Sequence, residues 1–194
     1  MIEVYSQVVD GVWFGAACIQ GQIVASTFGV SQHLTLSNIL ESVPLNVPFQ
    51  VFHEPSSFGK EVLSALRRIY IGQNVNASLP LAMSRLPSYT QKVLKATAQI
   101  PLGYVTSYGL IAKAVGGGPR AVGNVMASNP FAPIVPCHRV VKSDFTLGGY
   151  GGGLRVKVGI LGREKRGYLA SKEVAVNGRP LQVYPVEYVL KDLA

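Results

Sequence analysis

Short apolar runs separated by turn-forming residues make up the first 84 residues. Residues 12–19 and 22–28 flank the pair Gln20-Gly21, a pattern that predicts a hairpin of buried strands. Apolar residues then recur at helical spacing and predict a helix over 58–70, with Ser57 as its N-terminal cap. The expected inner face of that helix consists of Val62, Leu63, Leu66 and Ile69.

Helix signals dominate after a boundary at 85–87. A Ser-x-x-Gln pattern from Ser88 predicts a capping box, and its helix must stop before Pro101. Residues 104–106 are expected to be extended. Ser107 is expected to cap a helix over 108–115, and Pro119 suits the first turn of a third helix over 120–128. Two short helices joined by a glycine turn have the outline of a helix-turn-helix.

Composition narrows the class of protein. With 194 residues and 48% hydrophobic residues, the chain can form one domain or two small ones with a real core. The net charge of +8 favours polyanionic partners such as nucleic acid. Residues 1–5 lack the basic start of a signal peptide, and no apolar run reaches the roughly 18 residues of a membrane span. We therefore expect no membrane partner and a cytoplasmic location, or a nuclear one in a eukaryote.

The candidate chemistry centres on Cys137 and His138, which lie side by side among turn-forming residues. A cysteine is mostly a neutral thiol at pH 7, so a nucleophilic cysteine needs a base. His138 is the candidate base, through a water, and Glu164 is a candidate to orient it or else a solvated helix-end carboxylate. Cys18, in an apolar strand, is expected to be a small buried hydrophobe. The spacing gives no metal site.

The third helix is expected to have an unusual surface. Its residues Ala121, Gly123 and Ala127 are small, and Arg120 is the single long cation at its start. Small residues permit close approach to a narrow surface such as the DNA minor groove. They equally permit tight packing against another helix, and the sequence leaves both possibilities open.

Several motifs together carry a family resemblance. They are 100–109 (IPLGYVTSYG), 119–123 (PRAVG), Asn129-Pro130, 136–141 (PCHRVV) and 148–153 (GGYGGG) with Lys157. In order and spacing over about 88–168, the chain resembles the O6-alkylguanine-DNA alkyltransferases. The resemblance implies an α/β ribonuclease-H-like domain over 1–84 and a mostly α domain with a helix-turn-helix over 85–168. Residues 169–194 form an extension beyond the shared core.

The same resemblance implies a reaction and a partner. An alkyl group passes irreversibly from O6 of guanine in double-stranded DNA to Cys137, once per molecule, with no cofactor and a monomeric protein. His138 deprotonates Cys137 through a water, Glu164 holds His138, Asn129 ties the recognition helix to the active-site turn, and Tyr108 assists the leaving guanine. DNA contacts are implied for Arg120, as the finger that fills the stack, and for Tyr108, Ala121, Gly123 and Ala127. A guanine pocket is implied for Cys137, Val140, Tyr150, Gly151 and Met126.

Two departures and two alternatives accompany this interpretation. Gly151 stands where many relatives have serine, and Ala127 offers no charge where some relatives have a basic residue. A DNA-binding protein without transfer, of the alkyltransferase-like kind, is disfavoured because Cys137 is present. A cysteine hydrolase would require turnover and an oxyanion hole, and only the Cys-His pair supports it.

Overall fold

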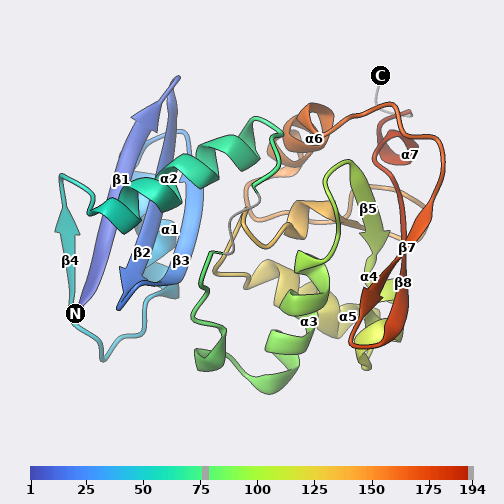
Figure 1. The fold of residues 1–194 in the computed structure, drawn as a ribbon, viewed down its shortest axis with the longest axis horizontal. Coiled ribbons are helices and arrows are strands. Elements are labelled where there is room, and N and C mark those ends of the chain that lie inside the picture. Colours follow the sequence, from blue (N-terminus) through green and yellow to red (C-terminus); the bar gives the residue numbers. More distant parts are fainter. Residues whose placement is uncertain (76–78, 192–194) are drawn as a thin grey trace. The chain divides into compact units, whose positions relative to one another are not determined.

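The computed structural model describes residues 1–75 and 79–191, and the chain divides into two compact units (Figure 1). The first unit comprises Met1–Tyr70, Asn74–Arg85 and Pro130–Ile134, and the second comprises Ile71–Gln73, Leu86–Asn129 and Val135–Ala194. In the described ranges no helix is both long and apolar enough to cross a membrane.

The first unit is built on a four-stranded sheet with the strand order β3-β2-β1-β4. Strands β1 (Ile2–Val9), β2 (Val12–Ile19) and β3 (Gln22–Gly29) are antiparallel, and β4 (Phe49–Phe52) pairs parallel with β1. The predicted hairpin is confirmed. Its turn residues Gln20 and Gly21 both have positive φ, the turn geometry that matches the natural twist of paired strands.

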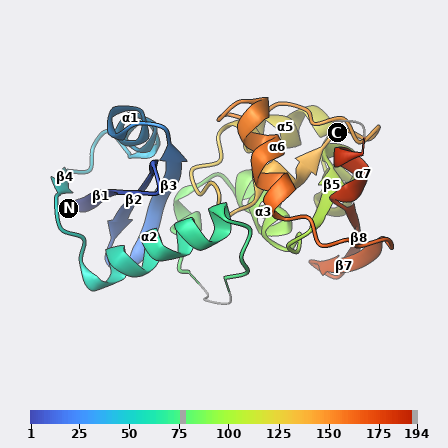
Figure 2. The ribbon, with the colours of Figure 1, turned by 90° about the horizontal axis from the view of Figure 1, so that it is seen from above.

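Two helices cover opposite faces of this sheet, α1 (Gln32–Ser42) and α2 (Ser57–Tyr70) (Figure 2). Gly15 lets α1 lie close to the sheet, because a Cβ at that position would be only 2.5 Å from the Ile39 side chain. The predicted α2 helix is confirmed, but its predicted cap is wrong. Ser57 lies inside the helix, and the Ser56 hydroxyl accepts the Gly59 N–H at 3.2 Å.

The second unit holds the three helices that were expected from Ser88 onward, α3 (Ser88–Ala98), α4 (Tyr108–Val115) and α5 (Pro119–Ala127). It also contains α6 (Leu154–Arg163) and the short α7 (Glu187–Leu190). The Ser107 cap is confirmed, since its hydroxyl accepts the Leu110 N–H at 3.2 Å. The predicted capping box at Ser88 is wrong, because Pro87 takes the cap position and Gln91 instead donates to the Leu86 carbonyl.

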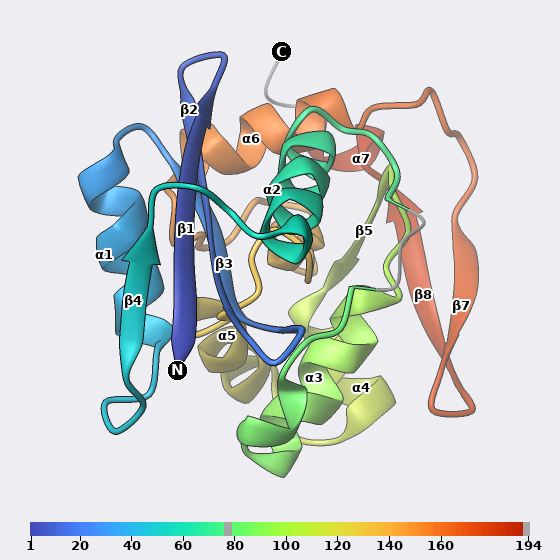
Figure 3. The same cartoon turned by 60° about the vertical axis from the view of Figure 1, so that its left-hand side comes forward.

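A second four-stranded sheet, with the order β6-β5-β8-β7, accompanies these helices. Its strands are β5 (Tyr104–Ser107), β6 (Val140–Val141), β7 (Lys172–Val176) and β8 (Arg179–Pro185), with β8 between β5 and β7 (Figure 3). Sequence patterns had predicted only β5. Residues beyond 169 thus complete the sheet of the second unit, and Val186 and Val189 join its buried cluster with Val105 and Leu161.

Between Asn129 and Val135 the chain leaves the second unit for five residues. Pro130–Ile134 belongs to the first unit, where the Ser26 N–H donates to the Pro130 carbonyl at 2.8 Å and the Ser26 hydroxyl donates to the Ala132 carbonyl. Phe131 is buried there. The segment directly before the Cys137 turn is therefore fixed by packing as well as by chain connectivity.

Candidate active site

Cys137 begins a single 3-10 turn, Cys137–Arg139, in the second unit. The residue is 7% exposed, so the thiol is nearly closed off from bulk water. Burial raises the pKa of Cys137, although a hydrogen bond from Asn129 and the charge of Lys157 act in the opposite direction. At neutral pH the thiol is therefore protonated, and its reactivity depends on a base.

His138 lies beside a buried carboxylate. Its Nε2 is 3.0 Å from Oε1 of Glu164, the residue that ends α6, and both side chains are fully buried. Arg139 binds the same carboxylate, with Nε donating to Oε2 at 2.9 Å and Nη2 donating to Oε1 at 2.8 Å. The alternative that Glu164 is a solvated helix-end carboxylate is wrong.

This carboxylate decides which nitrogen of His138 is basic. Burial would raise the pKa of Glu164, but the hydrogen bond from His138 and the charge and hydrogen bonds of Arg139 lower it overall, so the carboxylate is ionised and can only accept. Nε2 must then carry the hydrogen, which leaves the lone pair of a neutral imidazole on Nδ1. Nδ1 is buried and has no protein partner in the described part of the chain. Burial also lowers the pKa of His138, which favours this neutral form.

A buried lysine organises the loop that follows. Lys157 of α6 is fully buried and donates to the carbonyls of Val140, Leu147 and Gly149. Burial lowers the pKa of Lys157 to about 8, against the opposite effect of Cys137. One ammonium group thus fixes the end of the Cys137 turn and the start of the glycine-rich loop.

Asn129 and Tyr108 both reach this centre. The Asn129 side chain donates to the Val135 carbonyl at 2.9 Å, which joins the second residue after α5 to the chain two residues before Cys137. Tyr108, the first residue of α4, has its hydroxyl 3.5 Å from the Gly149 carbonyl. Burial raises the pKa of Tyr108, and the negative charge of an ionised Cys137 raises it further.

The expected pocket residues lie at different depths. Val140 is fully buried, and Tyr150 is partly buried, with a pKa raised by burial and by Cys137. Gly151 is exposed, and a Cβ there would meet nothing within 4 Å. Met126 belongs to the packing of α5 against α3, with its sulfur 3.8 Å from the Thr97 hydroxyl.

The surface of α5 is partly open. Arg120 and Ala127 are exposed, Ala121 and Gly123 are partly exposed, and a Cβ at Gly123 would meet nothing within 4 Å. Tight packing therefore does not explain the glycine at position 123. The inner face of the helix is formed by Val122, Val125 and Met126.

Sequence reasoning missed the contributions of Arg139 and Lys157. Arg139 directly follows His138 and donates to both oxygens of the same carboxylate, while Lys157 entered the sequence analysis only as part of a motif. A charged residue on the same helix face as the apolar Ile160 and Leu161, three and four positions later, is the signal that marks Lys157 as a candidate buried cation. Nothing in the local sequence shows that Arg139 and Glu164 meet.

The second unit thus belongs to a class of proteins built around one buried cysteine, an adjacent histidine–glutamate pair and an open helix of small residues. Residues 88–166 match the family model described as the 6-O-methylguanine DNA methyltransferase, DNA binding domain. The methylated-DNA–protein-cysteine methyltransferase of Mycobacterium leprae is 39% identical over 129 residues, which cover 61% of this chain and 78% of that protein. The chain belongs to the methylated-DNA–protein-cysteine methyltransferase family.

Two further comparisons agree with this assignment. The relative with the same name from Pyrobaculum aerophilum is 60% identical over 65 residues, 34% of this chain and 44% of that protein, so the match spans less than half of that relative. The solved structure of Mycobacterium tuberculosis OGT in complex with DNA is similar with a TM-score of 0.66 and 27% identity, and the match covers 84% of this chain and 92% of that chain.

Glu164→Gln should destabilise the protein at neutral pH by about 3–5 kcal/mol, because Arg139, whose side chain is only 12% exposed, loses its fully buried counter-charge. The fold lowers the pKa of Glu164, so its contribution is complete above the unfolded value of about 4.3 and is lost as the pH falls toward the folded pKa. The difference in unfolding free energy between wild type and variant should therefore shrink at acid pH.

Urea unfolding at a series of pH values measures this difference. Glu173→Gln, the same change at an exposed position of β7, is the matched control and should have little effect at any pH. An equal deficit for Glu164→Gln at pH 7 and at pH 3 would contradict the ionised state of this carboxylate.

Proposed function

We propose that this protein repairs DNA by transferring an alkyl group from O6 of guanine to the sulfur of Cys137, once per molecule. The observation that carries the proposal is the Cys137 turn itself. A nearly enclosed thiol is followed by a histidine whose only free ring nitrogen is Nδ1, and a buried carboxylate fixes that histidine. A thioether has no route to regeneration here, so one chain removes one alkyl group.

The proposed reaction begins with the thiol proton. It passes through a water to Nδ1 of His138, and the resulting imidazolium is stabilised by Glu164 at 3.0 Å. The thiolate attacks the alkyl carbon, the new C–S bond forms, and the C–O6 bond breaks with its electron pair moving to the guanine. Because burial keeps both Cys137 and His138 neutral at rest, the thiolate and the imidazolium form only when the proton passes to His138, and the attack then consumes the thiolate charge.

The leaving guanine needs a proton or a hydrogen bond. Tyr108 is a proposed donor, since burial raises the pKa of its hydroxyl and keeps it protonated. We also propose that Val140, Tyr150, Gly151 and Met126 line or support the guanine pocket. Asn129 is proposed to hold the cysteine turn to the end of α5, in line with its bond to Val135.

DNA is the proposed macromolecular partner, specifically a duplex that contains O6-alkylguanine, bound by a monomer. We propose that α4 and α5 act as a helix-turn-helix, with the small residues of α5 at the minor groove and Arg120 in the place of the flipped nucleotide. Support comes from the open Cβ position at Gly123 and from the exposed Arg120 at the start of α5. The strand order β3-β2-β1-β4 with α1 and α2 also fits a ribonuclease-H-like first unit.

Incubation with a duplex that contains one O6-methylguanine should raise the intact mass by one CH2 unit per chain, because a methyl group replaces the thiol hydrogen. Peptide mapping should place the modification on Cys137, and Cys137→Ser should gain no mass. Modification of Cys18, or more than one methyl removed per chain, would refute the proposal.

His138→Gln should slow transfer by roughly 10²–10⁴-fold, the usual contribution of a positioned base, with little change in affinity for duplex DNA. The reason is that His138 is buried and acts on the thiol, whereas phosphate contacts lie on the surface. Single-turnover rates and binding isotherms on the same variant separate the two effects. Weakened binding with an unchanged transfer rate would disprove the assignment.

Arg120→Ala should impair repair of duplex DNA far more than reaction with free O6-benzylguanine, which requires no flipping. Arg120 is an exposed residue in the first turn of α5, so the variant should fold normally. Transfer rates on the two substrates, taken from one preparation, give the comparison. Equal losses on both would mean that Arg120 serves the fold or the pocket.

A further inference from the structure

The second unit carries all of the excess positive charge. It contains fourteen of the 18 basic residues and five of the ten acidic ones, a net charge of +9, whereas the first unit has four basic and five acidic residues, a net charge of −1. Arg139 and Lys157 are committed to internal contacts around Cys137. Many of the remaining cations are exposed, and three of these lie around one cavity.

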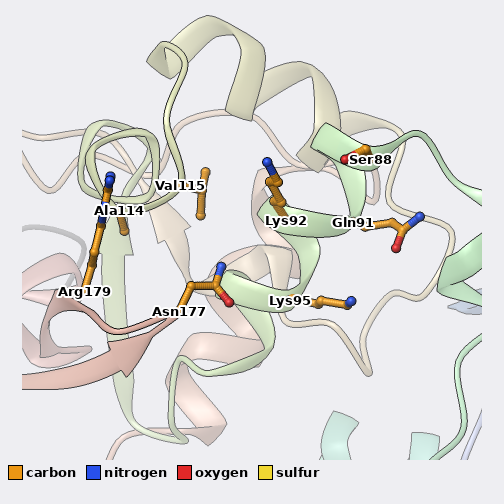
Figure 4. Close-up of a pocket in the computed structure, with 8 residues that line it drawn as sticks. All are labelled: Ser88, Gln91, Lys92, Lys95, Ala114, Val115, Asn177 and Arg179. Atoms are coloured by element: carbon orange, nitrogen blue, oxygen red, sulfur yellow. The ribbon is translucent and has the colours of Figure 1, made fainter.

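That cavity has a volume of about 500 Å³ and lies wholly within the second unit. Its walls are α3, the end of α4 and the turn between β7 and β8 (Figure 4). Lys92 and Lys95 come from α3 and Arg179 comes from the hairpin, together with the polar residues Ser88 and Asn177. No carboxylate lines it, and in the described ranges none of the three cations forms an ion pair.

The hairpin presents Arg179 on a rigid support. Asn177 and Gly178 both have positive φ, as a two-residue hairpin turn requires, and Val176 pairs directly with Arg179. These residues follow position 166, where the match to the family model ends. The cavity therefore combines α3, which lies in the matched region, with a wall formed by the extension.

The cavity also adjoins the proposed recognition helix. Val115 lines it, and only the turn at 116–118 separates that residue from Pro119 and Arg120 of α5. The Tyr89 hydroxyl of α3 donates to the Gly116 carbonyl at 3.2 Å, which ties α3 to this turn. Val115 in the cavity wall and Arg120 are five positions apart, so their Cα atoms are at most about 18 Å from each other. That length corresponds to about five base pairs, at roughly 3.4 Å per step along one strand.

We infer that the cavity lined by Lys92, Lys95 and Arg179 binds phosphates of the DNA backbone beside the lesion and so extends the contact surface beyond α5. The inference rests on the proposed function, because it assumes that α5 meets DNA. Lysine and arginine with hydroxyl and amide donors suit phosphate oxygens, and contacts of this kind position a protein without reading sequence. The extension thereby gives this chain a phosphate contact that the matched 88–166 region alone does not contain.

Lys92→Gln/Arg179→Gln is the test variant, and Lys60→Gln, which removes an exposed cation from the first unit, is the control. Binding of an undamaged duplex is measured as a function of salt concentration. Each lost phosphate contact lowers the salt slope by about 0.9, so the double variant should lose nearly 2 and the control almost nothing. Near 0.1 M salt, affinity should fall by roughly five- to ten-fold per cation removed. Transfer from free O6-benzylguanine should match wild type.

The outcomes separate the two proposals. If the wild type forms no thioether and binds no DNA, the proposed function fails. If it does both but the double variant keeps the slope of Lys60→Gln, the cavity proposal alone is overturned. A rise in Tm with inorganic phosphate that the double variant loses, without a change in DNA slope, would overturn it in favour of a small-anion site. Slower free-base transfer by the double variant would also overturn it, because the substitutions would then act on the Cys137 centre.

Discussion

The carboxylate of Glu164 is the group on which the Cys137 centre depends. It lies at the end of α6, fully buried, and accepts hydrogen bonds from two consecutive residues, His138 and Arg139. Arg139 also donates to the Ile100 carbonyl at 2.6 Å, near the end of α3. One ion pair thus fixes the turn that begins with Cys137, sets the tautomer of His138 and joins three segments that are distant in sequence.

Lys157 has a comparable role on the other side of the thiol. Its ammonium group uses three main-chain carbonyls in place of water, which allows a charged side chain to be fully buried. Because Lys157 lies in α6 and Glu164 caps its C-terminus, a single helix positions a cation near Cys137 and an anion at His138. A shift of α6 along its axis would disturb both.

The C-terminal extension is part of this arrangement. The Val186 N–H donates to the Gly103 carbonyl at 2.9 Å, and the Glu187 carboxylate accepts the N–H groups of Arg166 and Gly167, just beyond Glu164. Residues that lie outside the match to the family model therefore hold the chain on both sides of the buried ion pair. The same extension forms the hairpin that brings Arg179 to the basic cavity.

Local sequence determined much of what surrounds the site. Turn residues marked the first hairpin, glycine and proline marked the limits of α4 and α5, and the motif around Cys137 singled out a candidate nucleophile because its residue types are rare in combination. Two helix caps were predicted one residue too late, at Ser57 and Ser88. The neighbouring Ser56 offers the same hydroxyl acceptor to the first turn of α2, and Pro87 takes the cap position before α3. The β7–β8 hairpin was missed although Asn177-Gly178 is its signal.

Only the tertiary structure decided which charged groups meet. Residues from separate elements meet in three places: at the Glu164 carboxylate with His138 and Arg139, at the carbonyls around Lys157, and at the basic cavity. No periodicity in the sequence encodes which distant residues come into contact. Burial, which sets the direction of the pKa shifts of Cys137, His138 and Lys157, and the close ion partners that lower the pKa of Glu164 against burial, are likewise properties of packing. The sequence alone therefore determined the local elements and marked Cys137 as the candidate nucleophile, because both depend on neighbouring residues. The folded chain decided the protonation states and the surface charge, because those depend on long-range contacts.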